Sequence, residues 1–175
     1  MIPAADSIFT FGTKSLLAWS SSYALWEPIS YFLIRAMSSA KTVGEYYNPQ
    51  KTPVAVVFFG DFIYSTFLLL VAQQVIRYVL GTSGAWMLGL LLFMATQWIG
   101  DFSFYKFITA LKPTTRYIDF FQRYTKEVKV NAILGDSAYA VVWLALAQVM
   151  ASLVPAWGQV TLISLFMFGT LVFSY

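Results

Sequence analysis

The sequence predicts an all-α integral membrane protein, and three observations support this fold class. Hydrophobic residues make up 59% of the 175 residues and charged residues only 11%, whereas a soluble domain carries roughly 25% charged residues. Four stretches are apolar over the length of about 20 residues that a spanning helix needs. Two of those stretches share a sequence motif. We therefore expect a four-helix transmembrane bundle of two tandem parallel-repeat hairpins, with an N-terminal membrane-associated helix or helices and an amphipathic helix in the central loop.

The chain divides into four segments. Residues 1–52 form an interfacial or spanning helical segment, 53–105 the first transmembrane hairpin, 106–130 a basic amphipathic loop or helix, and 131–175 the second hairpin. The spanning helices are expected at residues 53–80, 85–104, 131–154 and 159–175. Glycine at 81–84 and proline with glycine at 155–158 indicate the two hairpin turns.

The N-terminal segment has two interpretations. Residues 15–37 are long enough to cross a bilayer, but Glu27 and Pro28 stand in their middle, and proline breaks a helix or occupies its first turn. Two shorter helices that meet near Trp26 and lie in the interface plane explain the sequence as well. We favour Glu27 as part of a helix start at the interface over a buried acid. The first residues do not have the pattern of a cleavable signal peptide.

Residues 114–129 predict an amphipathic helix, because aromatic residues recur there at helical spacing among basic ones. This helix should lie on the membrane surface or pack on the bundle. Its basic residues are candidates for binding anionic lipid headgroups, with a partner protein as the equal alternative; they are Arg116, Arg123, Lys126 and Lys129. Most other basic residues fall on the same side, which places the central loop and the C-terminus in the cytoplasm or its equivalent.

The two hairpins resemble each other in sequence. Residues 60–76 align without a gap on residues 135–151. The identical pairs are Gly60 and Gly135, Asp61 and Asp136, Tyr64 and Tyr139, Leu69 and Leu144, Ala72 and Ala147, and Gln73 and Gln148. Polar residues are rare in hydrocarbon, so the paired Asp and Gln indicate a duplication. Because each unit has two spans, the two units should be related by an axis along the membrane normal. We interpret a weaker copy at Gly100 and Asp101 as a coincidence of composition.

Asp61, Asp101 and Asp136 are the main candidates for chemistry. They should lie at one depth, toward the basic side of the membrane, where carboxylates could bind a cation or relay protons. The alternative is structural, because an aspartate near a helix N-terminus caps free N–H groups. We favour the structural role.

The other shared polar residues are expected to hold helices together. Tyr64 and Tyr139 should hydrogen-bond the aspartate on their own helix or the facing helix. Gln73 and Gln148, with Gln74 and the less certain Gln97, should bond one another across the bundle or line a polar path. The small residues predict close helix packing; they are Gly60, Gly135, Ala72 and Ala147.

Several kinds of function are excluded or disfavoured. The chain has no Cys and no His, which excludes disulfides, thiolate chemistry and Cys/His zinc sites. No nucleotide-binding or hydrolase motif is present, and we expect no metal, no cofactor, no nucleic-acid partner and no enzymatic activity. The favoured function is a structural subunit of a larger membrane assembly. Its expected partners are membrane lipids and either other proteins or further copies of the chain. The alternative is a small oligomeric transporter or channel for protons or cations, and a membrane enzyme acting on lipid ranks lowest.

Overall fold

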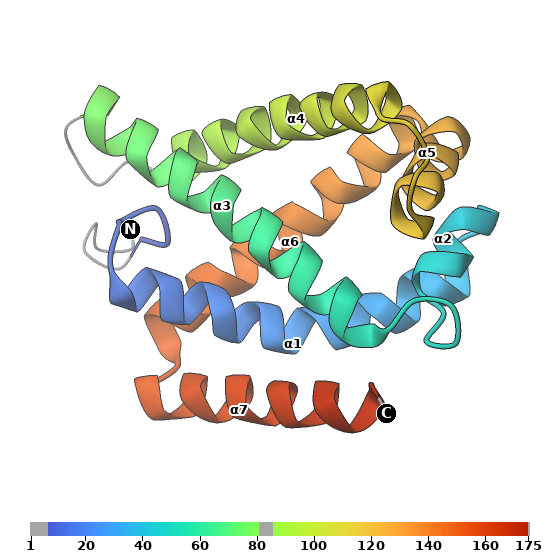
Figure 1. The fold of residues 1–175 in the computed structure, drawn as a ribbon. Helices are drawn as coiled ribbons and strands as arrows, with labels where there is room; N and C mark the ends of the chain where they lie inside the picture. The colour runs from blue at the N-terminus through green and yellow to red at the C-terminus, as the bar shows by residue number, and fades with distance from the viewer. Residues whose placement is uncertain (1–6, 81–85, 175) are drawn as a thin grey trace.

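The computed structural model describes residues 7–80 and 86–174, and this part of the chain forms helices without a strand (Figure 1). The turn predicted at 81–84 lies outside the described residues. The helices are α1 (Thr13–Met37), α2 (Lys41–Tyr46), α3 (Val54–Leu80), α4 (Trp86–Ala110), α5 (Arg116–Val128), α6 (Val130–Leu153) and α7 (Ala156–Phe173).

Four helices are long and apolar enough to cross a membrane, namely α3, α4, α6 and α7. They correspond to the four predicted stretches, with two corrections to the boundaries. Helix α4 runs to Ala110, beyond the predicted end at 104. Helix α7 begins directly after Pro155, so residues 156–158 form its first turn and the predicted turn is shorter. Proline suits the position before a first helical turn because its φ, here −65°, already matches the helix.

Helix α1 is one continuous helix of 25 residues with Pro28 inside it. The alternative of two short helices meeting near Trp26 is therefore wrong. A proline inside a helix removes one backbone hydrogen bond and crowds the preceding turn. Tertiary packing compensates here, because α1 lies between α6 and α7 and packs on both. Figure 1 shows α1 and α7 side by side, with α6 crossing behind α1 before it joins the start of α7.

Aromatic residues of α1 form the centre of the core. The ring of Trp19 stacks on that of Trp143 of α6 at a centroid distance of 3.7 Å. The indole N–H of Trp19 donates to Oγ1 of Thr66 in α3 at 3.0 Å, and the hydroxyl of Tyr23 donates to the carbonyl of Phe58 at 2.6 Å. These bonds satisfy the polar atoms of buried aromatic side chains and join α1 to α3, whereas the stacked tryptophan rings join α1 to α6.

The two predicted hairpins differ in how they pack. Helices α3 and α4 pack directly on each other, whereas α1 stands between α6 and α7. Next to the α6–α7 turn, Gln159 donates to the carbonyls of Met150 and Val154 at 2.9 and 2.7 Å. The expected symmetry between two similar hairpins stays a prediction.

Helices α2 and α5 cover the end of the bundle at which α3 and α6 begin (Figure 1). The helix predicted at 114–129 is present as α5, and the Thr115 hydroxyl caps it by accepting from the Ile118 N–H at 3.3 Å. Lys129, with φ of 50°, joins α5 directly to α6. The Glu127 carboxylate accepts from the backbone N–H groups of Lys41 and Thr42, each at 2.8 Å, and so caps α2 from α5.

Candidate functional site: a cavity lined by three aspartates

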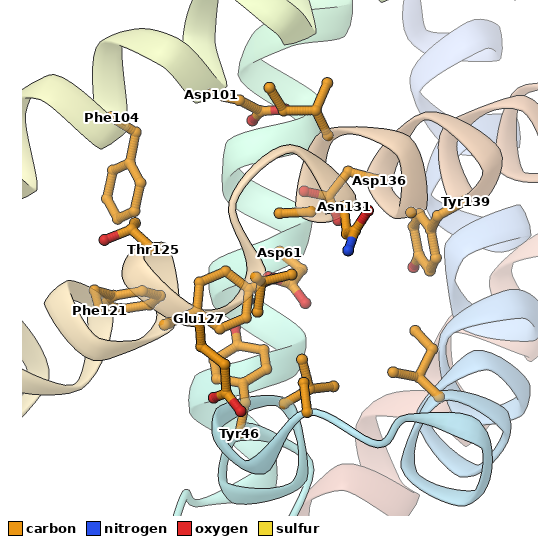
Figure 2. A pocket seen from close by; sticks show the side chains of 18 of the residues that line it. Tyr46, Asp61, Asp101, Phe104, Phe121, Thr125, Glu127, Asn131, Asp136 and Tyr139 are labelled. Atoms are coloured by element: carbon orange, nitrogen blue, oxygen red, sulfur yellow. Dashed lines mark hydrogen bonds between the residues drawn. The ribbon is translucent and has the colours of Figure 1, made fainter.

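A cavity of about 1630 Å³ opens at the end of the bundle that carries α2 and α5 (Figure 2). Its lining comes from α2, α3, α4, α5 and α6 and from the last residues of α1. Ligand sites in proteins usually measure about 300–1,000 Å³, so this cavity has room for an extended solute. The aromatic core around Trp19 and Trp143 lies beyond it, and Trp143 is among the lining residues.

Asp61, Asp101 and Asp136 all line this cavity, although they come from α3, α4 and α6. Figure 2 shows the three side chains around the same space. The first turns of α3 and α6 contain no acidic residue, so Asp61 and Asp136 do not cap their own helices, and that interpretation is wrong. Asp101 was grouped with the other two aspartates from its expected depth in the membrane, although its sequence motif was interpreted as a coincidence, and the fold places it at the same cavity.

Tyrosine hydroxyls bind the carboxylates from neighbouring elements. Tyr64 of α3 donates to Oδ1 of Asp101 in α4 at 2.7 Å, and Tyr46 of α2 donates to Oδ1 of Asp61 at 3.0 Å. Tyr139 of α6 donates to the carboxylate of Glu27 in α1. Tyr64 and Tyr139 thus donate to a facing helix, and neither donates to the aspartate of its own helix. A bond to the facing helix was one of the two interpretations of the sequence.

Two oxygen atoms at the cavity are buried without a hydrogen-bond partner in the described part of the chain. They are Oδ2 of Asp101 and Oε1 of Gln97. Gln97 is only 5% exposed, lines the cavity and stands four residues before Asp101, on the same face of α4. A buried acceptor without a donor costs free energy, so this part of the cavity favours a solute that carries N–H or O–H groups or a positive charge.

Glu27 is a functional candidate that the sequence interpretation placed wrongly. It lies in the middle of α1, is 1% exposed, and is therefore not part of a helix start at the interface. Its Oε2 accepts from Tyr139 and, at 3.4 Å, from Ser30, whereas its Oε1 has no partner among the described residues. In the sequence, Tyr23, Glu27 and Tyr31 recur every four residues, and residues four apart share one helix face. This spacing indicated that Glu27 lies on the same face of one helix as the two tyrosines.

Gln73 and Gln148 lie toward the other end of the bundle and hold the N-terminal segment. Gln73 Nε2 donates to the carbonyl of Ile8 at 2.8 Å, and the Ile8 N–H donates to Oε1 of Gln148 at 3.2 Å. The two glutamines therefore meet through the backbone of Ile8. Ile8 and Phe9 are buried in the core, at 0% and 1% exposure.

Close packing was predicted at the wrong glycines. A Cβ atom added to Gly60 or Gly135 would meet no atom within 4 Å, and both glycines line the cavity. The close approaches occur in α4. The ring of Phe9 occupies the space beside Gly89, and the hydroxyl of Tyr64 occupies the space beside Gly100. Ala72 and Ala147 are fully buried in the core.

Charged side chains line the mouth of the cavity. Arg116, Arg123, Lys126 and Lys129 all line it and are exposed. Arg123 pairs with Glu45 at 3.0 Å and with Asp119 at 3.2 Å. The hydrogen bond from Arg123 lowers the pKa of the Glu45 carboxyl, and hydrogen bonds from the Thr42 side chain and from the backbone of Thr42 and Lys41 lower that of Glu127. Both carboxylates therefore stay charged at neutral pH.

Comparisons with models of protein families, with curated proteins and with solved structures find no match to this chain.

Proposed function

We propose that the chain is a multi-pass membrane transporter that takes up protons or small cations in the cavity at the end of the bundle carrying α2 and α5. The observation that carries this proposal is the meeting of Asp61, Asp101 and Asp136, from three different helices, at one cavity. Carboxylates in a membrane-embedded helix are costly, and where they face a water-accessible cavity they mark ion or proton pathways.

The arrangement of the helices supports the proposal. The cavity lies within one chain, because α1 adds a fifth long helix to the four apolar ones. A dimer is therefore not needed to enclose it, although the chain can still form an oligomer. Toward the other end of the bundle, Ile8 and Phe9 are buried in the core, whereas the cavity opens at the end that carries α2 and α5. In alternating access a transporter exposes its solute site to one side of the membrane at a time.

The direct test is flux into liposomes. The purified full chain is reconstituted, a membrane potential is imposed, and proton entry is followed with a dye that reports the internal pH. We expect wild-type flux above that of empty liposomes. Single changes Asp61→Asn, Asp101→Asn and Asp136→Asn should each lower it, since an amide neither carries the negative charge nor releases a proton. Asp119→Asn is the matched control, because Asp119 is exposed on α5 and does not line the cavity.

The outcomes separate the candidate functions. Flux that is lost in the cavity variants and kept in Asp119→Asn supports transport. If wild-type liposomes show neither proton flux nor flux of sodium or potassium ions, or if flux survives all three substitutions, the transport proposal is wrong. Thermal unfolding in detergent shows whether each variant is folded.

The second candidate is a structural subunit of a membrane assembly, which the outer face of α7 favours. Large apolar side chains there are widely exposed, with Trp157 at 75%, Phe168 at 68% and Phe173 at 73%. Such a face suits lipid or a neighbouring protein. This proposal predicts that the chain extracted from its own membrane in mild detergent keeps stable partners, and a solitary monomer would speak against it.

A further inference from the structure

The cavity carries opposite charges in different parts. Asp61, Asp101 and Asp136 lie on the helices inside it, whereas the exposed Arg116, Lys126 and Lys129 line its mouth. The ion pairs found among the described residues join Lys51 and Arg123 to Glu45 and Arg123 to Asp119, so they include none of these six side chains. None of these six charges is thus neutralised by an ion pair among the described residues.

The spacing between the two charged parts can be read along α6. Lys129 directly precedes α6 and Asp136 follows seven positions later (136 − 129 = 7), and a helix rises about 1.5 Å per residue, which places the two Cα atoms about 10 Å apart along the axis. Asp136 therefore lies about two helical turns further along α6 than Lys129. A single small ion carries one sign of charge, so it cannot satisfy both the acidic and the basic part of the cavity.

The inner part of the cavity suits an ammonium group. An ammonium offers three N–H donors, and Oε1 of Gln97 and Oδ2 of Asp101 are buried acceptors without a partner in the described residues. Aromatic residues line the same region, among them Phe93, Tyr64 and Trp143, and aromatic faces attract organic cations. A metal ion fits less well, because no three acidic side chains in the described residues are close enough to hold one.

We infer that the solute of this cavity is a zwitterion with a terminal amine and a terminal acidic group at the two ends of a chain. Its ammonium group binds Asp101 and Gln97, and its carboxylate or phosphate binds Lys126 and Lys129 at the mouth. This inference rests on the proposed transport function and goes beyond it, because it adds an organic zwitterion to the protons or small cations proposed above. It also explains why basic residues line the mouth of a cavity whose interior is acidic.

Four probes with six-carbon chains test the inference in binding calorimetry on the full chain in detergent. They are aminocaproate, which carries both charges, hexamethylenediamine, which carries two positive charges, adipate, which carries two negative charges, and hexylamine, which carries one positive charge. We expect aminocaproate to bind most tightly. Its advantage over hexylamine should be about fivefold, the size that one exposed ion pair contributes. Longer and shorter amino acids of the same series then measure the preferred spacing.

Variants assign the two ends of the probe. Asp101→Asn should weaken both aminocaproate and hexylamine by about tenfold or more, since a hydrogen bond to a charged partner is lost. Lys126→Gln combined with Lys129→Gln should weaken aminocaproate and leave hexylamine unchanged. Asp119→Asn and Lys112→Gln are the matched controls, because neither residue lines the cavity.

The possible results decide between this inference and the proposed function. Equal or tighter binding of the diamine or of hexylamine would overturn the inference, because the anionic end would then have no counterpart. The inference also fails if none of the four probes binds while proton or metal-ion flux persists, and in that case the proposed function stands. Absence of flux with tight binding of aminocaproate would instead remove transport and leave a zwitterion-binding protein.

Discussion

Single residues explain where the helices approach closely. Gly89 allows the ring of Phe9 to lie against α4, and Phe9 is 1% exposed. Gly135 was the sequence-based candidate for such a contact, but a Cβ there would meet open space. Both glycines stand inside apolar helices, so a sequence pattern could not distinguish them. The difference comes from the N-terminal segment, which folds back onto α4 only in the tertiary structure.

This pair provides a prediction at the scale of the residue. Gly89→Ala should lower the free energy of unfolding by about 1–3 kcal/mol, because an added methyl group forces the ring of Phe9 to shift in a packed core. Gly135→Ala should be neutral or should stabilise the protein by up to about 1 kcal/mol, since alanine favours the helix. Thermal unfolding of both variants in the same detergent checks this. Equal melting temperatures for the two would contradict the contact between Phe9 and α4.

At the scale of the element, side chains distant in sequence hold the short segments. Gln73 and Gln148 together satisfy the N–H and carbonyl groups of Ile8. Glu127 of α5 similarly satisfies the first N–H groups of α2, and its carboxylate also accepts from the Thr42 hydroxyl at 2.5 Å. A helix of six residues such as α2 is too short to be stable alone. Its docking therefore depends on the charge of Glu127.

The docking of α2 should depend on pH. Hydrogen bonds from Thr42 and Lys41 lower the pKa of Glu127 in the folded protein, so the folded state favours the charged form. The stabilisation is present above the ordinary glutamate pKa of about 4.3 and is lost as the pH falls through the lower folded pKa. Hydrogen exchange of residues 41–46, corrected for the intrinsic pH dependence, should show protection at pH of about 6 that disappears below about 4.

The variant Glu127→Gln separates this effect from general acid unfolding. A glutamine cannot be deprotonated, so exchange of α2 should be faster at neutral pH and should lose its pH dependence over this range. Protection of α2 that is equal in the variant and the wild type would show that Glu127 does not hold the helix.

At the scale of the whole molecule, α1 organises the bundle. Trp19 contacts Thr66 of α3, Phe93 of α4 and Trp143 of α6, and α1 packs on both α6 and α7. Serine residues occupy several of its buried positions, including Ser21 and Ser22, whose hydroxyls donate to carbonyls of the preceding turn. This composition hides the helix from a search for apolar stretches, although it lies at the centre.

The central role of α1 gives a prediction for the whole bundle. Trp19→Ala should lower the free energy of unfolding by about 3–5 kcal/mol, the usual cost of removing a large buried aromatic side chain. Trp157→Ala is the matched control, because Trp157 is 75% exposed on α7 and its loss should cost about 1 kcal/mol or less. Unfolding in mixed detergent micelles measures both, and similar losses would contradict the position of α1 at the centre.

The amino-acid sequence alone determined the helical class, the four apolar helices and the amphipathic helix α5. Backbone groups in hydrocarbon must bond within their own segment, so a long apolar run predicts a helix whatever surrounds it. The sequence also singled out Asp61, Asp101 and Asp136, because charged residues in such runs are rare. Tyr64, Tyr139, Gln73 and Gln148 were likewise found as polar residues, but their partners were not.

Only the tertiary structure decided which elements meet. It placed α1 between α6 and α7, brought Asp101 to the cavity of the other two aspartates, buried Glu27 behind Tyr139, and joined Gln73 and Gln148 through Ile8. All these contacts join residues far apart in the chain. Local periodicity predicts the faces of a helix, whereas the choice among possible neighbours depends on the packing of all helices together, which no single segment specifies.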